Sequence, residues 1–218
     1  MKIFKNKLNK KLISLIKKGF NSDLVKDKNE YEANYIIFKS KIVNLIKQGA
    51  DVNFMNRKGE TPLSLIVQSP YYEVTKEIIN AGAYVHYKDE EKVSLLHIAV
   101  KSSQPEQVIL LINKSVDMNA QDINGFTALM YISEDRSDYY QLKALQILLK
   151  RGANINIQND WGETALHRAV FFNNYPVVKL FLENKADITL VDKSKHDVLY
   201  YAKDTDILNL LLNYKNKK

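Results

Sequence analysis

Residues 162–170 read GETALHRAV, and the same pattern returns three more times along the chain. The matching stretches are GETPLSLIV from Gly59, KVSLLHIAV from Lys92 and GFTALMYIS from Gly125, so the four starts lie 33, 33 and 37 residues apart. A second motif, KRGANIN at residues 150–156, alternates with the first at the same spacing. Its copies end at Asn53, His86, Asn119, Asn156 and Thr189. Two motifs that keep one register predict a stack of repeated units.

Each repeat carries the signals of two helices. The hydroxyl residue before the first helix is a predicted N-cap, because its oxygen can accept a hydrogen bond from an otherwise unpaired backbone amide. These residues are Thr61, Ser94, Thr127 and Thr164. Gly82 and Gly152 follow the second helix, where a left-handed residue closes a helix. The second helix has apolar residues at helical spacing, as at Val177, Leu180 and Phe181.

These stretches resemble the ankyrin repeat, which is marked by a T-P-L-H-x-A helix start and a G-A-D-V-N turn. The resemblance covers residues 41–191 and continues in weaker copies to both ends. It implies an all-α ankyrin-repeat solenoid of stacked helix-turn-helix pairs joined by β-hairpin-like turns, with about six pairs including divergent caps. We expect a single domain, 1–218, with an N-terminal cap at 1–22, repeats at 23–55, 56–88, 89–121, 122–158 and 159–191, and a C-terminal cap with a lysine tail at 192–218.

The N-terminal end departs from the family pattern. Residues 10–21, KKLISLIKKGFN, are predicted to form an outer helix and a turn, with Leu12, Leu15 and Ile16 directed inward. A divergent repeat at 23–55 follows, without a T-P-L-H stretch.

Two further departures fall within the repeats. Lys92 and Lys195 stand where the turn glycine is usual, which leaves the shape of those two turns open. The segment EDRSDYYQ, residues 134–141, makes its repeat four residues longer than its neighbours. Such an insertion goes to a connecting loop, where it is either drift or a binding feature.

The composition and motifs bound the classes of function. The chain has no Cys, which excludes thiolate metal sites, and its glycines are all used by turns and helix ends. No P-loop, G-x-S-x-G or H-E-x-x-H motif occurs. His97 and His167 occupy the T-P-L-H histidine, where the resemblance implies a structural hydrogen bond to a neighbouring turn. We expect a non-enzymatic cytoplasmic protein with no metal and no cofactor, and export into a host cell stays open.

The resemblance also implies that a partner binds at the turn tips and at the ends of the first helices. Trp161, Phe171, Phe172 and, one repeat earlier, Phe126 fall at such positions, which the fold does not need to fill. An exposed aromatic patch is unusual on a monomer, and Trp is enriched among residues that dominate binding energy. The alternative is that one Phe turns inward or that Trp161 lies on its own turn. The predicted partner-binding set also includes Asp160, Glu163, Ile123, Glu134, Asp135, Arg57 and Lys58.

The partner expected from this set is another protein with basic residues around an apolar anchor, bound by a monomeric chain. Inhibitor, adaptor and effector roles all fit this expectation. The net charge of +7 supports a second hypothesis, because residues 1–50 hold twelve Lys against four acids. Those lysines could bind nucleic acid or an anionic membrane, but aromatic residues suited to stacking on bases are scarce among them. We therefore expect neither as the main partner.

Overall fold

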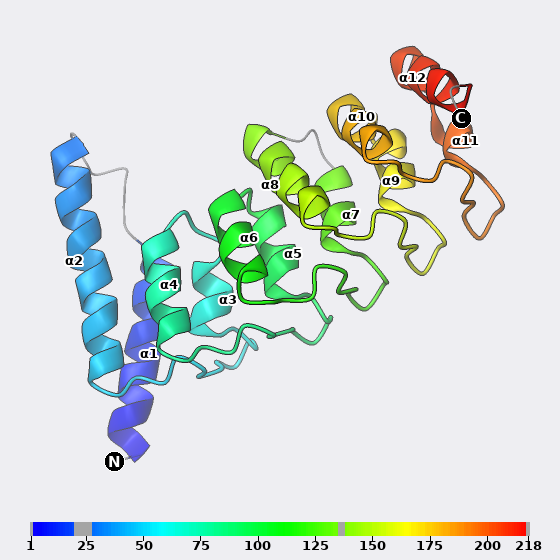
Figure 1. Ribbon diagram of the computed structural model, residues 1–218. Coiled ribbons are helices and arrows are strands. Elements are labelled where there is room, and N and C mark those ends of the chain that lie inside the picture. Colours follow the sequence, from blue (N-terminus) through cyan, green and yellow to red (C-terminus); the bar gives the residue numbers. More distant parts are fainter. Residues whose placement is uncertain (1, 20–27, 135–137, 217–218) are drawn as a thin grey trace. The chain divides into compact units, whose positions relative to one another are not determined.

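A computed structural model describes residues 2–19, 28–134 and 138–216. In these residues the chain forms twelve α-helices and no β-strand, which confirms the predicted all-α architecture of six helix pairs (Figure 1). Contacts divide the chain into two units, residues 1–89 and residues 90–218. None of the helices in the described ranges is long and apolar enough to cross a lipid bilayer.

The first unit contains α1 to α4. Their bounds are Lys2–Lys18, Lys28–Lys47, Pro62–Ile66 and Tyr72–Asn80. α1 packs against both α2 and α3, and α2 packs against α4. The prediction of an outer helix at residues 10–21 was therefore wrong, because α1 lies beside α3, the first helix of the next pair. Leu12 and Ile16 are buried as expected, but Leu15 is only partly buried, on the side of α1 that faces α2.

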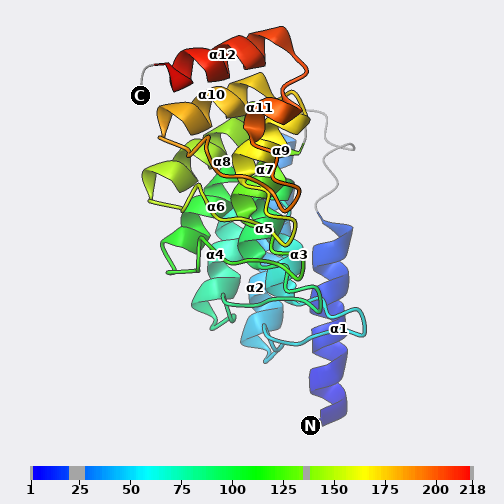
Figure 2. The same ribbon diagram turned by 90° about the vertical axis from the view of Figure 1, so that its right-hand side faces the viewer.

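The second unit contains α5 to α12 in two rows. Their bounds are Leu95–Lys101, Pro105–Ile112, Ala128–Ser133, Tyr139–Lys150, Ala165–Phe171, Tyr175–Glu183, Val198–Tyr201 and Thr205–Lys215. α5, α7, α9 and α11 pack in sequence as the row of first helices, and α6, α8, α10 and α12 form the row of second helices (Figure 2). Each row buries apolar residues against the other, such as Leu96, Val108 and Phe181.

The predicted N-caps begin the first helices. Thr61, Ser94 and Thr164 each accept a hydrogen bond from the backbone amide three residues later, and the side chain of that third residue accepts one from the backbone amide of the cap. Thr127 occupies the same position in α7 but makes no such side-chain bond. These caps fix where the chain leaves each turn, and so they fix the direction of the residues just before the helix.

The turn before each first helix forms a finger. Four of these fingers are residues 89–93, 122–126, 159–163 and 192–196, and all of their residues except Asp89 belong to the second unit. Successive fingers are joined by backbone hydrogen bonds, in which an amide donates to a carbonyl of the finger before. The pairs are Ile123 N to Glu91 O at 2.8 Å, Asp160 N to Asn124 O at 3.0 Å and Lys193 N to Trp161 O at 2.9 Å.

This close approach explains two of the turn glycines. A Cβ added to Gly125 would lie 2.8 Å from Asp160 N, and one added to Gly162 would lie 2.8 Å from Lys193 N. Lys92 and Lys195 take the same left-handed backbone, with φ of 59° and 65°, so their fingers keep the usual shape. A lysine at these positions therefore carries conformational strain and leaves the turn geometry unchanged.

Candidate functional site

Four aromatic side chains of the second unit, which we call the aromatic patch, are Trp161, Phe126, Phe171 and Phe172. Trp161 is 51% exposed, and Phe171 and Phe172 are 50% and 39% exposed, while Phe126 is half-buried. The Phe126 and Trp161 ring centroids lie 5.8 Å apart at an interplanar angle of 72°. Those of Phe171 and Phe172 lie 5.1 Å apart at 85°. Phe171 and Phe172 therefore both stay exposed, and the Trp161 ring packs edge-on against Phe126 of the preceding finger.

Arg168 joins the two halves of the aromatic patch. Its guanidinium carbon lies 4.9 Å from the Phe126 ring centroid and 5.2 Å from that of Phe172. Nη1 donates to Glu163 Oε2 at 3.1 Å, and Nη2 donates to Glu134 Oε1 at 2.7 Å. The side chain is only 18% exposed, so these charges interact through less water than at an open surface. One cation therefore fixes two aromatic rings and two carboxylates.

The place of Arg168 in the repeat explains this role. Arg168 directly follows the histidine of the T-P-L-H motif. Phe172 is the C-cap of α9, four residues after Arg168, so the two side chains lie on the same face of the helix. Tyr131 and Tyr201 occupy the same position in the neighbouring repeats. Their hydroxyls donate to the carboxylates of Asp122, at 2.9 Å, and Asp192 in their own fingers.

Sequence reasoning missed this position, although a signal was present. A large side chain with a polar end follows the motif histidine position in three successive repeats, at spacings of 37 and 33 residues. Tyr131 and Tyr201 also extend the row of aromatic rings. Tyr131 lies 6.2 Å from Phe126, and Tyr201 lies 6.1 Å from Phe171, measured between ring centroids.

The Asp192–Tyr201 pair perturbs both groups. The hydrogen bond to Asp192, followed by burial, raises the pKa of Tyr201 to about 12. Burial by itself would raise the pKa of Asp192, but hydrogen bonds from the Tyr201 hydroxyl and the backbone of His196 and Ser194 outweigh it and lower that pKa. The pair is therefore most stable with an ionised carboxylate and a neutral phenol.

The two motif histidines are buried in structural positions. His97 Nε2 lies 3.0 Å from Phe126 O, which confirms the predicted bond to a neighbouring turn. His167 Nδ1 lies 2.8 Å from Thr164 Oγ1, but its Nε2 has no hydrogen-bond partner among the described residues. Burial lowers the pKa of His167, and the nearby His196 backbone and acidic side chains only partly oppose this. His167 therefore favours the neutral form.

The predicted acidic rim is partly neutralised. Asp160 is exposed at a finger tip, but Glu163 and Glu134 are both paired with Arg168. Together with Arg168 these three acids carry a formal charge of −2. Ile123 is exposed at the tip of the preceding finger. Asp135 lies outside the described residues.

Arg57 and Lys58 belong to the first unit. Both are exposed in the finger at residues 56–60, where Lys58 N donates to Asn56 Oδ1 at 2.8 Å. They line a groove of that unit together with residues of α1. Within the described parts of both units, no group of three or more His, Asp or Glu side chains is placed to hold a metal ion.

The chain resembles known repeat proteins over most of its length. The family model for ankyrin repeats matches residues 33–122, 66–142, 96–192 and 137–218. An ankyrin repeat protein of fowlpox virus is 31% identical over 166 residues, which cover 74% of this chain and 84% of that protein. The mouse B-cell lymphoma 3 protein homolog is 27% identical over 172 residues, which cover 77% of this chain and 38% of that protein.

A third relative is the chicken nuclear factor NF-kappa-B p105 subunit. It is 31% identical over 151 residues, which cover 67% of this chain and 15% of that protein. The match thus spans most of the fowlpox virus relative, but well under half of the mouse and chicken proteins.

Proposed function

The chain belongs to the ankyrin repeat family, and on that premise we propose that it is a non-enzymatic module that binds another protein through the aromatic patch. Ankyrin repeats are general protein-interaction modules, and the fowlpox virus relative is itself named as an ankyrin repeat protein. The chain would act by covering a surface of its partner or by recruiting it, as an inhibitor, an adaptor or an effector.

The observation that carries this proposal is a half-exposed Trp161 within an ordered cluster of rings. An aromatic side chain that is already held in place loses little conformational freedom on binding, so more of its burial appears as affinity. Arg168 holds Phe126 and Phe172, and Phe126 in turn packs against Trp161. Truncation of a buried Trp at the centre of an interface often costs about 2 kcal/mol or more of binding free energy.

The charges around the aromatic patch favour a particular partner. Asp160 is exposed. Arg168 pairs with both Glu163 and Glu134, and the four side chains together carry a formal charge of −2. We therefore propose a partner that places an apolar side chain against Trp161 and Phe172, with Lys or Arg beside it.

The test is an affinity capture from lysate of the source or host, with wild type compared with Trp161→Ala/Phe172→Ala. A matched control is Tyr139→Ala/Tyr140→Ala, which removes two exposed rings that contact each other on α8. Circular dichroism should show that all three proteins are equally helical. A partner captured by wild type and the tyrosine variant, but not by the Trp161 variant, supports the proposal, and its affinity can then be measured by calorimetry.

The control also separates the alternatives. Loss of capture only in the tyrosine variant would move the site to the insertion at residues 134–141. Equal capture by all three proteins would move it to the lysine-rich first fifty residues. In that second candidate, where nucleic acid or an anionic membrane is bound, affinity should fall steeply as salt rises. Binding through the aromatic patch should depend on salt only weakly.

A further inference from the structure

The net charge of the protein lies in its first unit. Residues 1–89 hold sixteen Lys and Arg against nine Asp and Glu, a net of +7. Residues 90–218 hold sixteen of each, a net of zero. A difference of this size directs oppositely charged ligands to one unit and increases their rate of association.

A groove of about 740 Å³ in the first unit concentrates this charge, and we call it the basic groove. It lies between α1 and the segment that leads into the finger at residues 56–60. Lys10 and Lys18 of α1 and Arg57 of the finger supply cations, while Phe54 and Met55 supply apolar surface beside the buried Ile13. Met55 is more than half exposed, so this apolar surface is accessible to a ligand.

The cations of the basic groove are largely available. Lys17 is engaged, because its amine donates to Glu60. By contrast, Lys10, Lys18 and Arg57 form no ion pair with any residue that the structure describes. An acidic ligand could therefore pair with them without first displacing a carboxylate of any residue that the structure describes.

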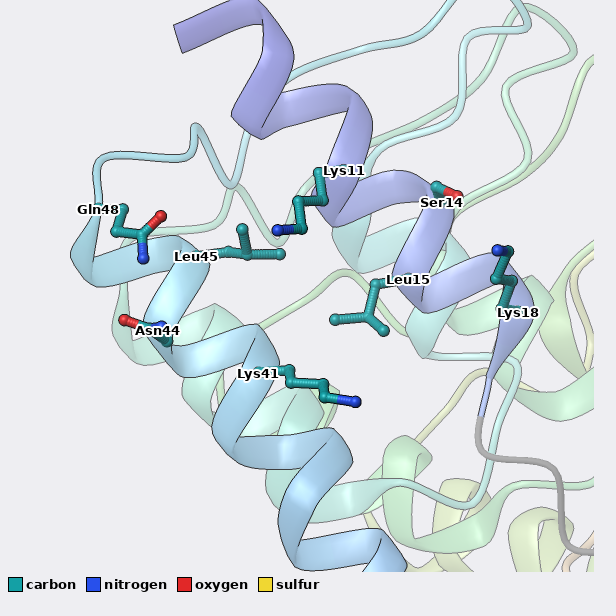
Figure 3. A pocket seen from close by; sticks show the side chains of 8 residues that line it. All are labelled: Lys11, Ser14, Leu15, Lys18, Lys41, Asn44, Leu45 and Gln48. Carbon is teal, nitrogen blue, oxygen red and sulfur yellow. The ribbon is translucent and has the colours of Figure 1, made fainter. Parts of the chain in front are cut away.

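Positive charge continues on the other side of α1. A smaller hollow of about 370 Å³ separates α1 from α2, and Lys18 lines both this hollow and the basic groove. Figure 3 shows Lys11 from α1 and Lys41 from α2 reaching into this space beside Leu15 and Leu45. Among the residues that the structure describes, no Asp or Glu lines either space, so the described lining is basic on two sides of α1.

We infer that the basic groove binds an acidic segment of a partner protein that carries at least one large apolar side chain. Carboxylates of the segment pair with Lys10, Lys18 and Arg57, and the apolar side chain covers Met55 and Phe54. Charge complementarity with a small apolar contact at its centre is the combination that gives a specific and fast-binding interface. This surface is distinct from the aromatic patch and does not depend on it.

The same residues disfavour a membrane or a nucleic acid. Leu8, Leu12 and Ile16 of α1 are buried within the first unit, so the helix offers no continuous apolar face to a bilayer. Among the described residues, Phe54 is the one aromatic side chain that lines the basic groove, whereas binding of single-stranded nucleic acid uses several rings that stack on successive bases.

The experiment is a selection with the full chain, using displayed peptides in which every position is Glu, Asp, Leu, Phe or Ser. The variant Lys10→Glu/Arg57→Glu reverses two groove charges, and Met55→Ser removes the apolar contact. The matched control Lys114→Glu/Lys179→Glu makes the same charge change at two exposed lysines of the second unit. Labelled oligo-dT and phosphatidylserine vesicles serve as competing probes.

We expect enriched peptides that combine acids with Leu or Phe. Their affinity should fall at least tenfold in Lys10→Glu/Arg57→Glu, fall several-fold in Met55→Ser, and stay unchanged in the control and in Trp161→Ala/Phe172→Ala. Three results would overturn the inference: no enrichment, enrichment of acids without an apolar preference, or tight binding of oligo-dT or vesicles in place of the peptides. None of these results bears on the aromatic patch, because its own variants are scored separately.

Discussion

Replacement of Arg168 by Ala should destabilise the second unit by about 2 kcal/mol. The guanidinium lies over the rings of Phe126 and Phe172, and each such contact contributes about 0.5–1 kcal/mol when it is partly exposed. The ion pairs with Glu163 and Glu134 add about 0.2–1 kcal/mol each, with the lower value for Glu134, which is more exposed. These contacts share one side chain, so their sum is an upper bound.

The assay is urea unfolding followed by the fluorescence of Trp161. This residue is the single Trp of the chain, so its signal reports on the second unit. Near-ultraviolet circular dichroism should also weaken in Arg168→Ala, because Phe126 would lose a contact that orients it against Trp161. Arg151→Ala is the matched control, since Arg151 is exposed and its guanidinium donates only to Asn113, at 3.1 Å. The control should change stability by about 0.5 kcal/mol or less.

A double-mutant cycle with Glu163→Gln separates the ion pair from the contacts with the rings. If Arg168→Ala costs no more than Arg151→Ala and leaves the near-ultraviolet signal intact, then the guanidinium does not organise the aromatic patch. The proposal that the aromatic patch is ordered before it binds a partner would then be wrong.

Three further perturbations test the fold around the site. Gly162→Ala should lower the free energy of unfolding by about 1–3 kcal/mol more than Gly152→Ala. Both glycines have positive φ, but of the two only Gly162 would place the new Cβ against the backbone of the next finger. Equal losses of stability for the two variants in urea unfolding would contradict the close approach of the fingers. Tyr201→Phe should flatten the alkaline stability profile, because the raised pKa of Tyr201 gives a stabilisation that is present below pH 10.0 and lost as pH rises to about 12. The lowered pKa of His167 gives stability that is present above pH 6.5 and lost as pH falls below it, so thermal unfolding of wild type should be more sensitive to mild acid than that of His167→Asn.

Much of the fold follows from local signals that recur. The T-P-L-H and G-A-D-V-N stretches place a helix cap and a chain reversal at fixed offsets, and each acts through backbone groups within a few residues. The helix pairs, the buried histidines and the exposure of Trp161, Phe171 and Phe172 could therefore be predicted. The position of α1 could not, because apolar spacing shows that a helix is buried on one side but does not name the helix that it packs against.

The centre of the candidate site was also beyond local reasoning. Arg168 pairs with Glu134, which is 34 residues away, and lies over Phe126 from the preceding finger. An arginine between buried positions of a helix looks like a solvated residue unless its neighbours in space are known. The sequence left the shape of the fingers at Lys92 and Lys195 open, because a left-handed lysine is strained but is tolerated when the rest of the finger holds it.

The bonds between fingers have a direction, and this has an evolutionary consequence. The fingers at 122–126, 159–163 and 192–196 each donate from the second residue to the third residue of the finger before, so these three fingers present the same pair of groups. Duplication or loss of a whole 33-residue block would therefore rejoin the row without a change of register. The longer repeat leaves the row intact for a related reason. Its added residues lie partly in the connection between α7 and α8, which has five residues against three in the pairs α5–α6 and α9–α10, and partly in α8 itself, and both lie outside the fingers. Length can thus vary in such lineages by complete repeats or in helix connections, while a single-residue insertion in a finger would break the row.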